Sequence, residues 1–248
     1  MKLHSLICVG MFAAAGAALG GDVISGTTCA AMAVPATGMY TLIAVPFKDV
    51  GGKEAKVKVA DVVKTVGLKK DSQLFYYTGE NYYAWKLDGD GGAWTGAIVA
   101  SASEKEGESV TMQTPPADFQ VPCGATLWLQ RAAESEEGVV LYGEEAPVLN
   151  PTLTAKSVQL ISNPKATDYT FTAAGADGDM IMIPQDNGTQ TAYTYKTGKG
   201  WGQYKGTAEK IPGTEIPLSK FETATITIPG GRGAWYVSKG DTVPSIAW

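Results

Sequence analysis

Residues 41–46 read TLIAVP and residues 159–164 read QLISNP, and this recurrence guides the interpretation of the whole chain. Each segment runs from apolar residues into a proline, which is typical of a buried strand that ends at a turn. Other short motifs recur in the same order, at offsets between 107 and 118. They are Gly67 with Gly175, Asp71 with Asp179, 83–86 with 193–196, Trp94 with Trp201, 121–124 with 228–231, and Trp128 with Trp235. Ordered self-similarity of this kind predicts an internal duplication.

The offset between matching residues falls from 118 at Pro46 to 108 at Gly67. The first copy therefore contains about ten residues between Pro46 and Gly67 that the second copy lacks. Apolar side chains recur there at helical spacing. They are Val59, Val62, Val63 and Val66. We therefore expect a short helix inserted in the first copy, with Gly67 as its C-terminal cap.

The remaining pattern is strand and turn. The chain has 248 residues with 30 Gly and 13 Pro, which favours many short elements joined by turns. Aromatic and β-branched runs at 73–78 and 81–87, and again at 180–184 and 191–196, predict two hairpins. We expect an all-β protein made of two tandem β-sandwich or open-barrel-like repeats. Their predicted limits are 21–146 and 158–248, with a linker at 147–157.

Residues 1–20 are typical of a secretory signal peptide, with an apolar run followed by small residues. We expect cleavage after Gly20 and an exported protein that is periplasmic, on the cell surface or extracellular and does not span the membrane. Cleavage would remove His4, the only histidine, which excludes catalysis or metal binding through imidazole.

Charge argues against binding to nucleic acid. Residues 21–150 carry ten Lys and Arg against seventeen Asp and Glu, and residues 151–248 carry nine against eight. A basic surface supplies most of the affinity for a phosphate backbone, and an acidic chain lacks it.

The order of the repeated motifs resembles a family of proteins. The motifs come in the order Leu-Ile-x-x-Pro, a Gly with an Asp four residues later, an aromatic hairpin, a Trp, and a Pro-x-Gly that leads to a strand with a Trp. Residues 22–42, which precede them, resemble the opening strand and turn of the same family. This order is similar to an uncharacterised paralogous family of secreted two-copy β-proteins of Gram-negative bacteria. The resemblance implies the fold, but it implies no catalytic residue, because that family has no assigned activity.

Two candidate chemistries depend on carboxylates. Asp88 and Asp90 alternate with glycines, so their oxygens could converge on calcium, although a plain hairpin turn needs only the glycines. A glycoside hydrolase can work with two carboxylates and no histidine, but the carboxylates here gather in acidic loops. Asp71 and Asp179 are expected to occupy matching turns and to bond backbone N–H groups. We therefore expect no cofactor, no catalytic residue and no metal site beyond this weak calcium candidate.

The aromatic side chains of the paired hairpins are the strongest binding candidates. Exposed Tyr and Trp can stack on sugar rings or anchor a protein partner. The candidates are Tyr76, Tyr82, Tyr83, Trp94, Tyr193, Trp201 and Tyr204. If Trp85 and Tyr195 are buried, Tyr76 and Tyr82 are expected to form a solvent-facing strip. The repeated pairs Trp85 with Tyr195 and Trp128 with Trp235 are expected to fill the cores.

Cys29 and Cys123 are predicted to form a disulfide, because export places them in an oxidising compartment and the second copy lacks both equivalents. On these grounds we expect a non-catalytic structural protein of the envelope or cell surface. The alternatives are a module that binds a polysaccharide or a protein through exposed Tyr and Trp, and a histidine-independent glycoside hydrolase.

Overall fold

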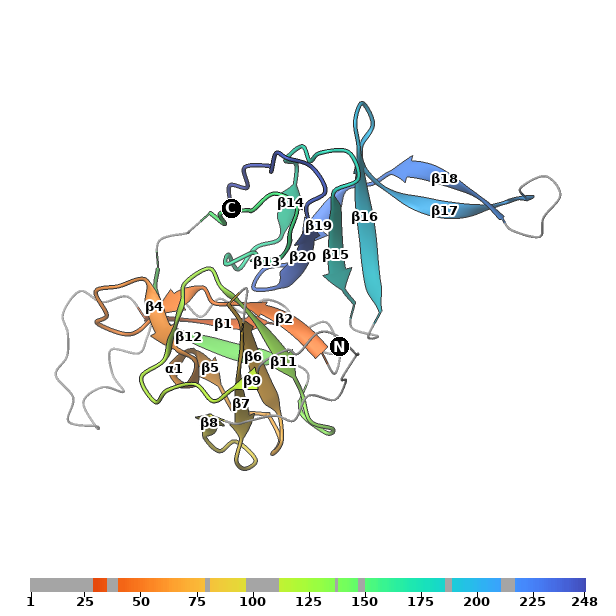
Figure 1. Ribbon diagram of the computed structural model, residues 1–248. Coiled ribbons are helices and arrows are strands. Elements are labelled where there is room, and N and C mark those ends of the chain that lie inside the picture. The colour runs from red at the N-terminus through yellow and green to blue at the C-terminus, as the bar shows by residue number, and fades with distance from the viewer. Residues whose placement is uncertain are drawn as a thin grey trace.

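The computed structural model confirms an all-β protein built from several antiparallel sheets (Figure 1). It describes residues 29–34, 40–78, 81–96, 112–136, 138–146, 150–185, 189–210 and 217–248. The predicted signal peptide and its cleavage site lie outside these residues. In the described residues, no helix is long and apolar enough to cross a membrane.

The strands up to residue 145 pair among themselves and make the first half of the molecule. A sheet of order β2-β11-β6-β7-β8 forms one layer, and β9 runs parallel to β7 at its edge. A second sheet, β1-β12-β3 with β5 also on β12, and the ribbon β4-β10 cover its inner face. The strands are β1 (Cys29–Val34), β2 (Tyr40–Ala44), β3 (Phe47–Lys48), β4 (Lys56–Lys58), β5 (Val63–Lys64), β6 (Gln73–Tyr77), β7 (Tyr82–Leu87), β8 (Trp94–Gly96), β9 (Met112–Gln113), β10 (Gln120–Pro122), β11 (Thr126–Gln130) and β12 (Val139–Glu145).

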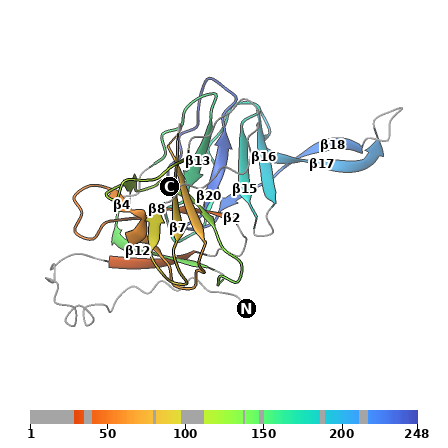
Figure 2. The ribbon, with the colours of Figure 1, turned by 60° about the horizontal axis from the view of Figure 1, so that its bottom comes forward.

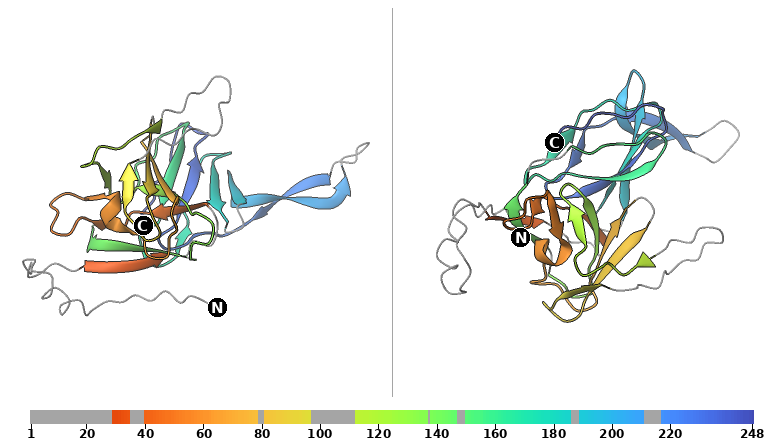
Figure 3. Two further views of the ribbon diagram at one scale, coloured as in Figure 1. Left: turned by 90° about the horizontal axis from the view of Figure 1, so that it is seen from below. Right: turned by 60° about the vertical axis from the view of Figure 1, so that its left-hand side comes forward.

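The strands from residue 158 onward make the second half. A sheet of order β13-β20-β15-β16-β17-β18 is covered by the ribbon β14-β19. The strands are β13 (Val158–Ser162), β14 (Tyr169–Phe171), β15 (Met180–Pro184), β16 (Gln190–Lys196), β17 (Gly200–Lys210), β18 (Pro217–Thr223), β19 (Ile226–Ile228) and β20 (Gly233–Val237). Figure 2 and the left view of Figure 3 show β17 and β18 projecting from the body as an arm.

The alternating pattern of each strand explains the two cores. In β11, Leu127 and Leu129 point inward and are fully buried, while Trp128 points to the other face. Side chains alternate between the two faces of a strand, so one face of each sheet builds the core of its own half. The second core is built in the same way around Ile181 and Tyr236.

The predicted helix is present but shorter than the valine spacing indicates. It is α1 (Val59–Val62), and the chain returns to a strand at Val63. Val59, Val62 and Val63 are buried, whereas Val66 is 76% exposed. Gly67 has a positive φ of 81° but lies five residues beyond the helix, so it closes a later turn and not the helix.

The two large sheets share strand order and register. The order β2-β11-β6-β7-β8 corresponds to β13-β20-β15-β16-β17, and the ribbon β4-β10 to β14-β19. Trp128 lies opposite Leu42 and Phe75, and Trp235 lies opposite Leu160 and Met182. The match therefore extends from the sheets to individual residue pairs.

This register moves one of the predicted matches by two residues. Phe75 lies opposite Ala84, and its counterpart Met182 lies opposite Ala192. Trp85 therefore corresponds to Tyr193 and not to Tyr195. A shift of two residues keeps each side chain on the same face, so the apolar pattern alone does not reveal it.

The two halves contact each other through reciprocal groups. The Ala44 N–H donates to the Gly231 carbonyl at 2.8 Å, and the Ser162 hydroxyl donates to the Gly124 carbonyl at 2.9 Å. Ala44 matches Ser162 and Gly124 matches Gly231, so the contact has the two-fold character of a symmetric dimer interface. Gly233 permits the close approach, because a Cβ there would lie 2.6 Å from the Thr126 methyl group.

Candidate functional site

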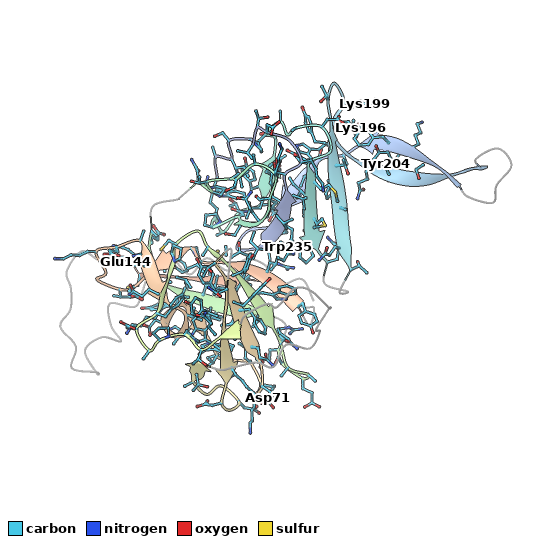
Figure 4. All side chains as sticks on the ribbon, viewed as in Figure 1. Asp71, Glu144, Lys196, Lys199, Tyr204 and Trp235 are labelled. Atoms are coloured by element: carbon cyan, nitrogen blue, oxygen red, sulfur yellow. The ribbon has the colours of Figure 1, made fainter. Side chains whose placement is uncertain are left out.

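An aromatic groove lies where the two halves meet. The Tyr40 and Trp128 rings are 6.0 Å apart between centroids, and the Trp128 and Trp235 rings are 6.1 Å apart, both edge to face. Tyr40 is 42% exposed and the two tryptophans are half-buried. Figure 4 labels Trp235 at this junction. Three large rings therefore present partly open surfaces in one place.

The groove exists because of the sheet faces that build it. Trp128 and Trp235 stand on the faces turned away from the two cores, at matching positions of β11 and β20. The prediction that these residues fill the core of each half is wrong. Each instead packs against the other half, and together they line a hollow of about 100 Å³.

Neutral polar groups complete the walls of the aromatic groove. The described residues that line it are Tyr40, Thr41, Leu42, Trp128, Pro184, Gln185, Thr189, Gln190 and Trp235. Amides and hydroxyls both donate and accept hydrogen bonds, which suits a ligand rich in hydroxyl groups. None of these residues is an acid or a base that could transfer a proton near neutral pH.

A second hollow, the arginine pocket, opens in the second half and has a volume of about 310 Å³. It shares Pro184 and Gln185 with the aromatic groove. The described residues that line it are Ile183, Pro184, Gln185, Tyr193, Thr225, Thr227, Pro229 and Arg232. Arg232 is the one charged residue among them, and it is only 8% exposed.

The structure separates the predicted strip of Tyr76 and Tyr82. Tyr76 lies opposite Tyr83 and packs on the first core, whereas Tyr82 lies opposite Tyr77 on the other face. Tyr77 and Tyr82 stack with centroids 4.6 Å apart. Burial raises the pKa of the Tyr76 phenol. Burial is also the main cause of the raised pKa of Tyr82, and the neighbouring Tyr77 adds to it. A single strip of these two side chains is therefore not formed.

Trp94 and Trp201 belong to the cores. Each is buried, at 7% and 8% exposed. The Trp94 indole N–H donates to the Val63 carbonyl at 2.9 Å, and the Trp201 indole N–H donates to the Ala173 carbonyl at 2.8 Å. Their polar atoms are used inside the protein, so the structure gives them a structural role and no binding surface.

The other predicted tyrosines lie apart. Tyr83 contacts Phe119 with centroids 4.2 Å apart at the edge of the first core. Tyr193 lines the arginine pocket. Tyr204 is 52% exposed on the arm, where the Lys196 ammonium lies 4.9 Å from its ring centroid (Figure 4). Of the seven predicted residues, only Tyr193 lines one of the two hollows.

The predicted calcium loop is closed by its own contacts. The Ala93 N–H donates to Asp88 at 2.7 Å, and the Lys70 N–H donates to Asp90 at 2.8 Å. The Lys70 N–H and the Lys69 ammonium hold the pKa of Asp90 below its usual range. Among the described residues no three Asp, Glu, His or Cys side chains gather as a metal site. The geometry is that of a turn.

The predicted disulfide between Cys29 and Cys123 is not formed, and both thiols are free. Cys29 begins β1 opposite Glu144, while the buried Cys123 thiol donates to the Phe47 carbonyl at 3.1 Å. Because β12 lies between β1 and β3, Cys29 is two strand spacings from the strand that Cys123 contacts. Two strand spacings amount to about 10 Å, so Cys29 stands well away from β3.

A buried carboxylate and phenol form a polar cluster in the second half. Asp179 is fully buried and accepts hydrogen bonds from the Tyr236 hydroxyl at 2.5 Å, the Ala176 N–H at 2.8 Å and the Lys239 N–H at 2.7 Å. Burial and the Asp179 carboxylate raise the pKa of Tyr236 far above its usual range. Since its oxygens are occupied by protein donors, this cluster is structural.

Sequence reasoning missed the residues that form the groove. The repeated tryptophans were visible as a pair, but an apolar residue that packs between two halves looks the same in sequence as one that packs in a core. Arg232 had no motif around it. Tyr40 and Gln185 gave no signal either, because each lies at the end of a strand and joins the groove only in the fold.

Comparisons with protein-family models, with curated proteins and with solved structures found no match. The resemblance to a secreted two-copy family therefore stays a prediction. The assignment of a function depends on the geometry of the two hollows.

Proposed function

We propose that this protein is an exported, non-catalytic β-protein of the cell envelope that binds a saccharide in the aromatic groove. The observation that carries the proposal is the cluster of Tyr40, Trp128 and Trp235, whose rings remain partly open at the junction of the halves. Sugar rings combine apolar C–H faces with hydroxyl groups, and aromatic side chains with amides beside them suit both.

A binding role fits the chemistry of the groove better than catalysis. Glycoside hydrolysis needs two carboxylates on either side of the scissile bond. The described residues that line the two hollows include no Asp or Glu. The buried Asp179 is held by four protein donors, so it is poorly placed to act on a substrate.

We also infer that the two halves are copies of one unit. The shared strand order, the matching partners of Trp128 and Trp235, and the matching indole bonds of Trp94 and Trp201 support this inference. On this account the groove lies near the two-fold axis of a fused dimer, and the copies diverged around it.

The proposed function is tested by binding of the purified protein to a glycan array, followed by calorimetry with the oligosaccharide bound best. We expect Trp128→Ala and Trp235→Ala each to weaken binding about 2- to 12-fold, the range of one lost ring contact. Gln190→Ala probes the exposed wall without touching the packed rings. Tyr204→Ala is the matched control, because it removes an exposed aromatic side chain on the arm.

Thermal melting checks that each variant is folded. If no oligosaccharide binds, or if a folded Trp128→Ala variant binds as well as Tyr204→Ala does, the proposal is refuted.

The arm favours a second candidate, a structural role in an assembly. β18 ends the strand order of its sheet, and within the described residues it pairs only with β17. A free strand edge is a template for pairing with another chain. Sedimentation at increasing protein concentration distinguishes the two: growth into polymers would support assembly, whereas a single monomeric species would remove this candidate.

A further inference from the structure

The free edge of the arm carries a symmetric order of side chains. Residues 219–223 of β18 read SKFET, so a hydroxyl, a cation, a ring, an anion and a hydroxyl follow one another. β18 ends the strand order of its sheet, and in the described part of the chain its one strand partner is β17. An antiparallel strand along this edge meets it in reverse order. The edge is therefore complementary to a second copy of itself, with Phe221 at the centre.

The charges select this register. With the two Phe221 side chains opposite each other, Lys220 of each copy lies opposite Glu222 of the other. Moving the centre by one residue places Lys220 opposite Lys220, or Glu222 opposite Glu222. Opposite charges across a strand pair stabilise it, and like charges directly opposite each other destabilise it. Of these three registers, only the one centred on Phe221 is attractive.

Lys220 faces another lysine within its own chain. It lies opposite Lys205 in the ladder of β17 and β18, and like charges in such a pair repel. Glu222 binds Lys205, with 3.0 Å between the ammonium and the carboxylate. Within the described residues no carboxylate forms an ion pair with Lys220. Glu222 of a second copy would supply the countercharge that the arm itself does not give to Lys220.

The ring of Phe221 is held in place beside the free edge. Its centroid lies 5.4 Å from that of Tyr204 and 5.2 Å from the Lys196 ammonium, where the arm leaves the body (Figure 4). Phe221 lies opposite Tyr204 in the ladder, so both rings stand on one face of the arm. Lys220 and Glu222, the neighbours of Phe221 in sequence, stand on the other face. A second copy therefore meets a ring on one face and charges on the other.

We propose that β18 pairs edge to edge with β18 of a second copy, as an antiparallel strand pair centred on Phe221. Each copy offers the same strand, and such an isologous contact closes at two copies. The inference is independent of the saccharide function, and it replaces the open polymer considered above by a closed pair. Because an edge contact of a few residues is small, the dimer is weak and depends on protein concentration.

Charge reversal tests the register. Lys220→Glu and Glu222→Lys each turn both attractive pairs of the dimer into repulsive ones, so we expect each variant alone to dimerise about 10-fold more weakly or worse. A mixture of the two variants should regain the loss, because every residue 220 then faces an opposite charge at residue 222. Lys199→Glu is the control, since it makes the same change in net charge at an exposed turn outside the edge. Sedimentation velocity over a range of concentrations measures the dimer, and thermal melting checks folding.

A cross-link tests the contact while keeping the charges, and it remains informative if a charge-reversed variant does not fold. Phe221→Cys places two thiols opposite each other, within the Cα separation that a disulfide spans. Ser219→Cys does not, because Ser219 of one copy lies opposite residue 223 of the other. Both changes are made with Cys29→Ser, which removes the exposed native thiol. We expect mild oxidation to give a covalent dimer with Phe221→Cys and a monomer with Ser219→Cys.

The outcomes decide between this dimer and other arrangements of the arm. A monomer–dimer equilibrium that each reversal weakens and the mixture restores supports the inference. A monomer at every concentration, or growth beyond two copies, would refute it. A dimer that Lys220→Glu weakens no more than Lys199→Glu does would refute the charged contact. Equal cross-linking of the two cysteine variants would refute the register centred on Phe221.

Discussion

The turn that precedes β6 in the first half and the turn that precedes β15 in the second half are closed by different side chains at the same position. Ser72 and Asp179 match, because their carbonyls accept the equivalent N–H groups of Leu87 and Tyr195. Both residues are fully buried. The predicted match of Asp71 with Asp179 is therefore wrong by one residue. Asp71 instead has a φ of 72° and pairs with Lys86 at the surface, 2.8 Å away.

The two side chains satisfy the same backbone group in different ways. The Ser72 hydroxyl accepts the Ala132 N–H at 3.0 Å, and the Asp179 carboxylate accepts the equivalent Lys239 N–H at 2.7 Å. A carboxylate has more lone pairs to satisfy than a hydroxyl. Tyr236 supplies the extra donor, and Leu129 stands at the matching position in the first half. The turn therefore tolerates a change of side chain when its hydrogen-bond partners change with it.

The largest effect is expected at this pair of turns. Asp179→Ala removes the acceptor of the buried Tyr236 hydroxyl and of three backbone N–H groups, and we expect it to lower the free energy of unfolding by about 3 to 5 kcal/mol. Ser72→Ala removes one hydroxyl and should cost about 1 to 2 kcal/mol. Urea denaturation measures both. Equal costs would show that the carboxylate and phenol add nothing to the turn.

A second difference between the halves concerns Cys123, whose counterpart is Gly230. Burial raises the pKa of the Cys123 thiol from 9.0 to about 11. Between these two pH values the unfolded chain releases the proton while the folded chain keeps it, so stability is lost as pH rises from about 9 to 11. The loss should reach about 3 kcal/mol.

The measurement is the free energy of unfolding at pH 8 and pH 11 in the unmodified protein and in Cys123→Ala, which removes the thiol. The variant also controls for the tyrosines that titrate in the same range. An alkaline loss of equal size in both proteins would contradict the assignment.

Smaller effects than for Asp179→Ala are expected where the halves agree. Trp94→Phe and Trp201→Phe each remove an indole N–H from a buried carbonyl contact. We expect each to cost about 1 to 3 kcal/mol. Similar costs, measured by urea denaturation, would support the equivalence of the two positions. A cost confined to one of the two would show that the matched geometry hides different roles.

Much of the fold was predictable from the sequence. Strands 73–77 and 82–87 follow from the alternation of aromatic residues, and the recurrence of TLIAVP as QLISNP located β2 and β13. The hairpin match was shifted by two residues, because that shift preserves the faces of every side chain. The helix was overextended, because valine spacing does not show that Val63 leaves the helix to pair with Leu141.

The site was less predictable than the fold. Its rings come from strand ends and from sheet faces that meet only when the halves pack together, and no local pattern reports such a contact. Tyr76 and Tyr82 are six residues apart, but the pairing of Tyr76 with Tyr83 places them on opposite faces. Arg232 stands out only once the volume around it is known.

The most direct test of the saccharide account is a titration of the protein with its best oligosaccharide while the indole N–H signals are followed by NMR. Trp128 and Trp235 line the aromatic groove, whereas the N–H groups of Trp94 and Trp201 are bonded inside the cores and serve as internal controls. The account predicts that the signals of Trp128 and Trp235 shift and that those of Trp94 and Trp201 stay in place. If the ligand binds while the indole N–H signals of Trp128 and Trp235 stay unchanged, the account is contradicted.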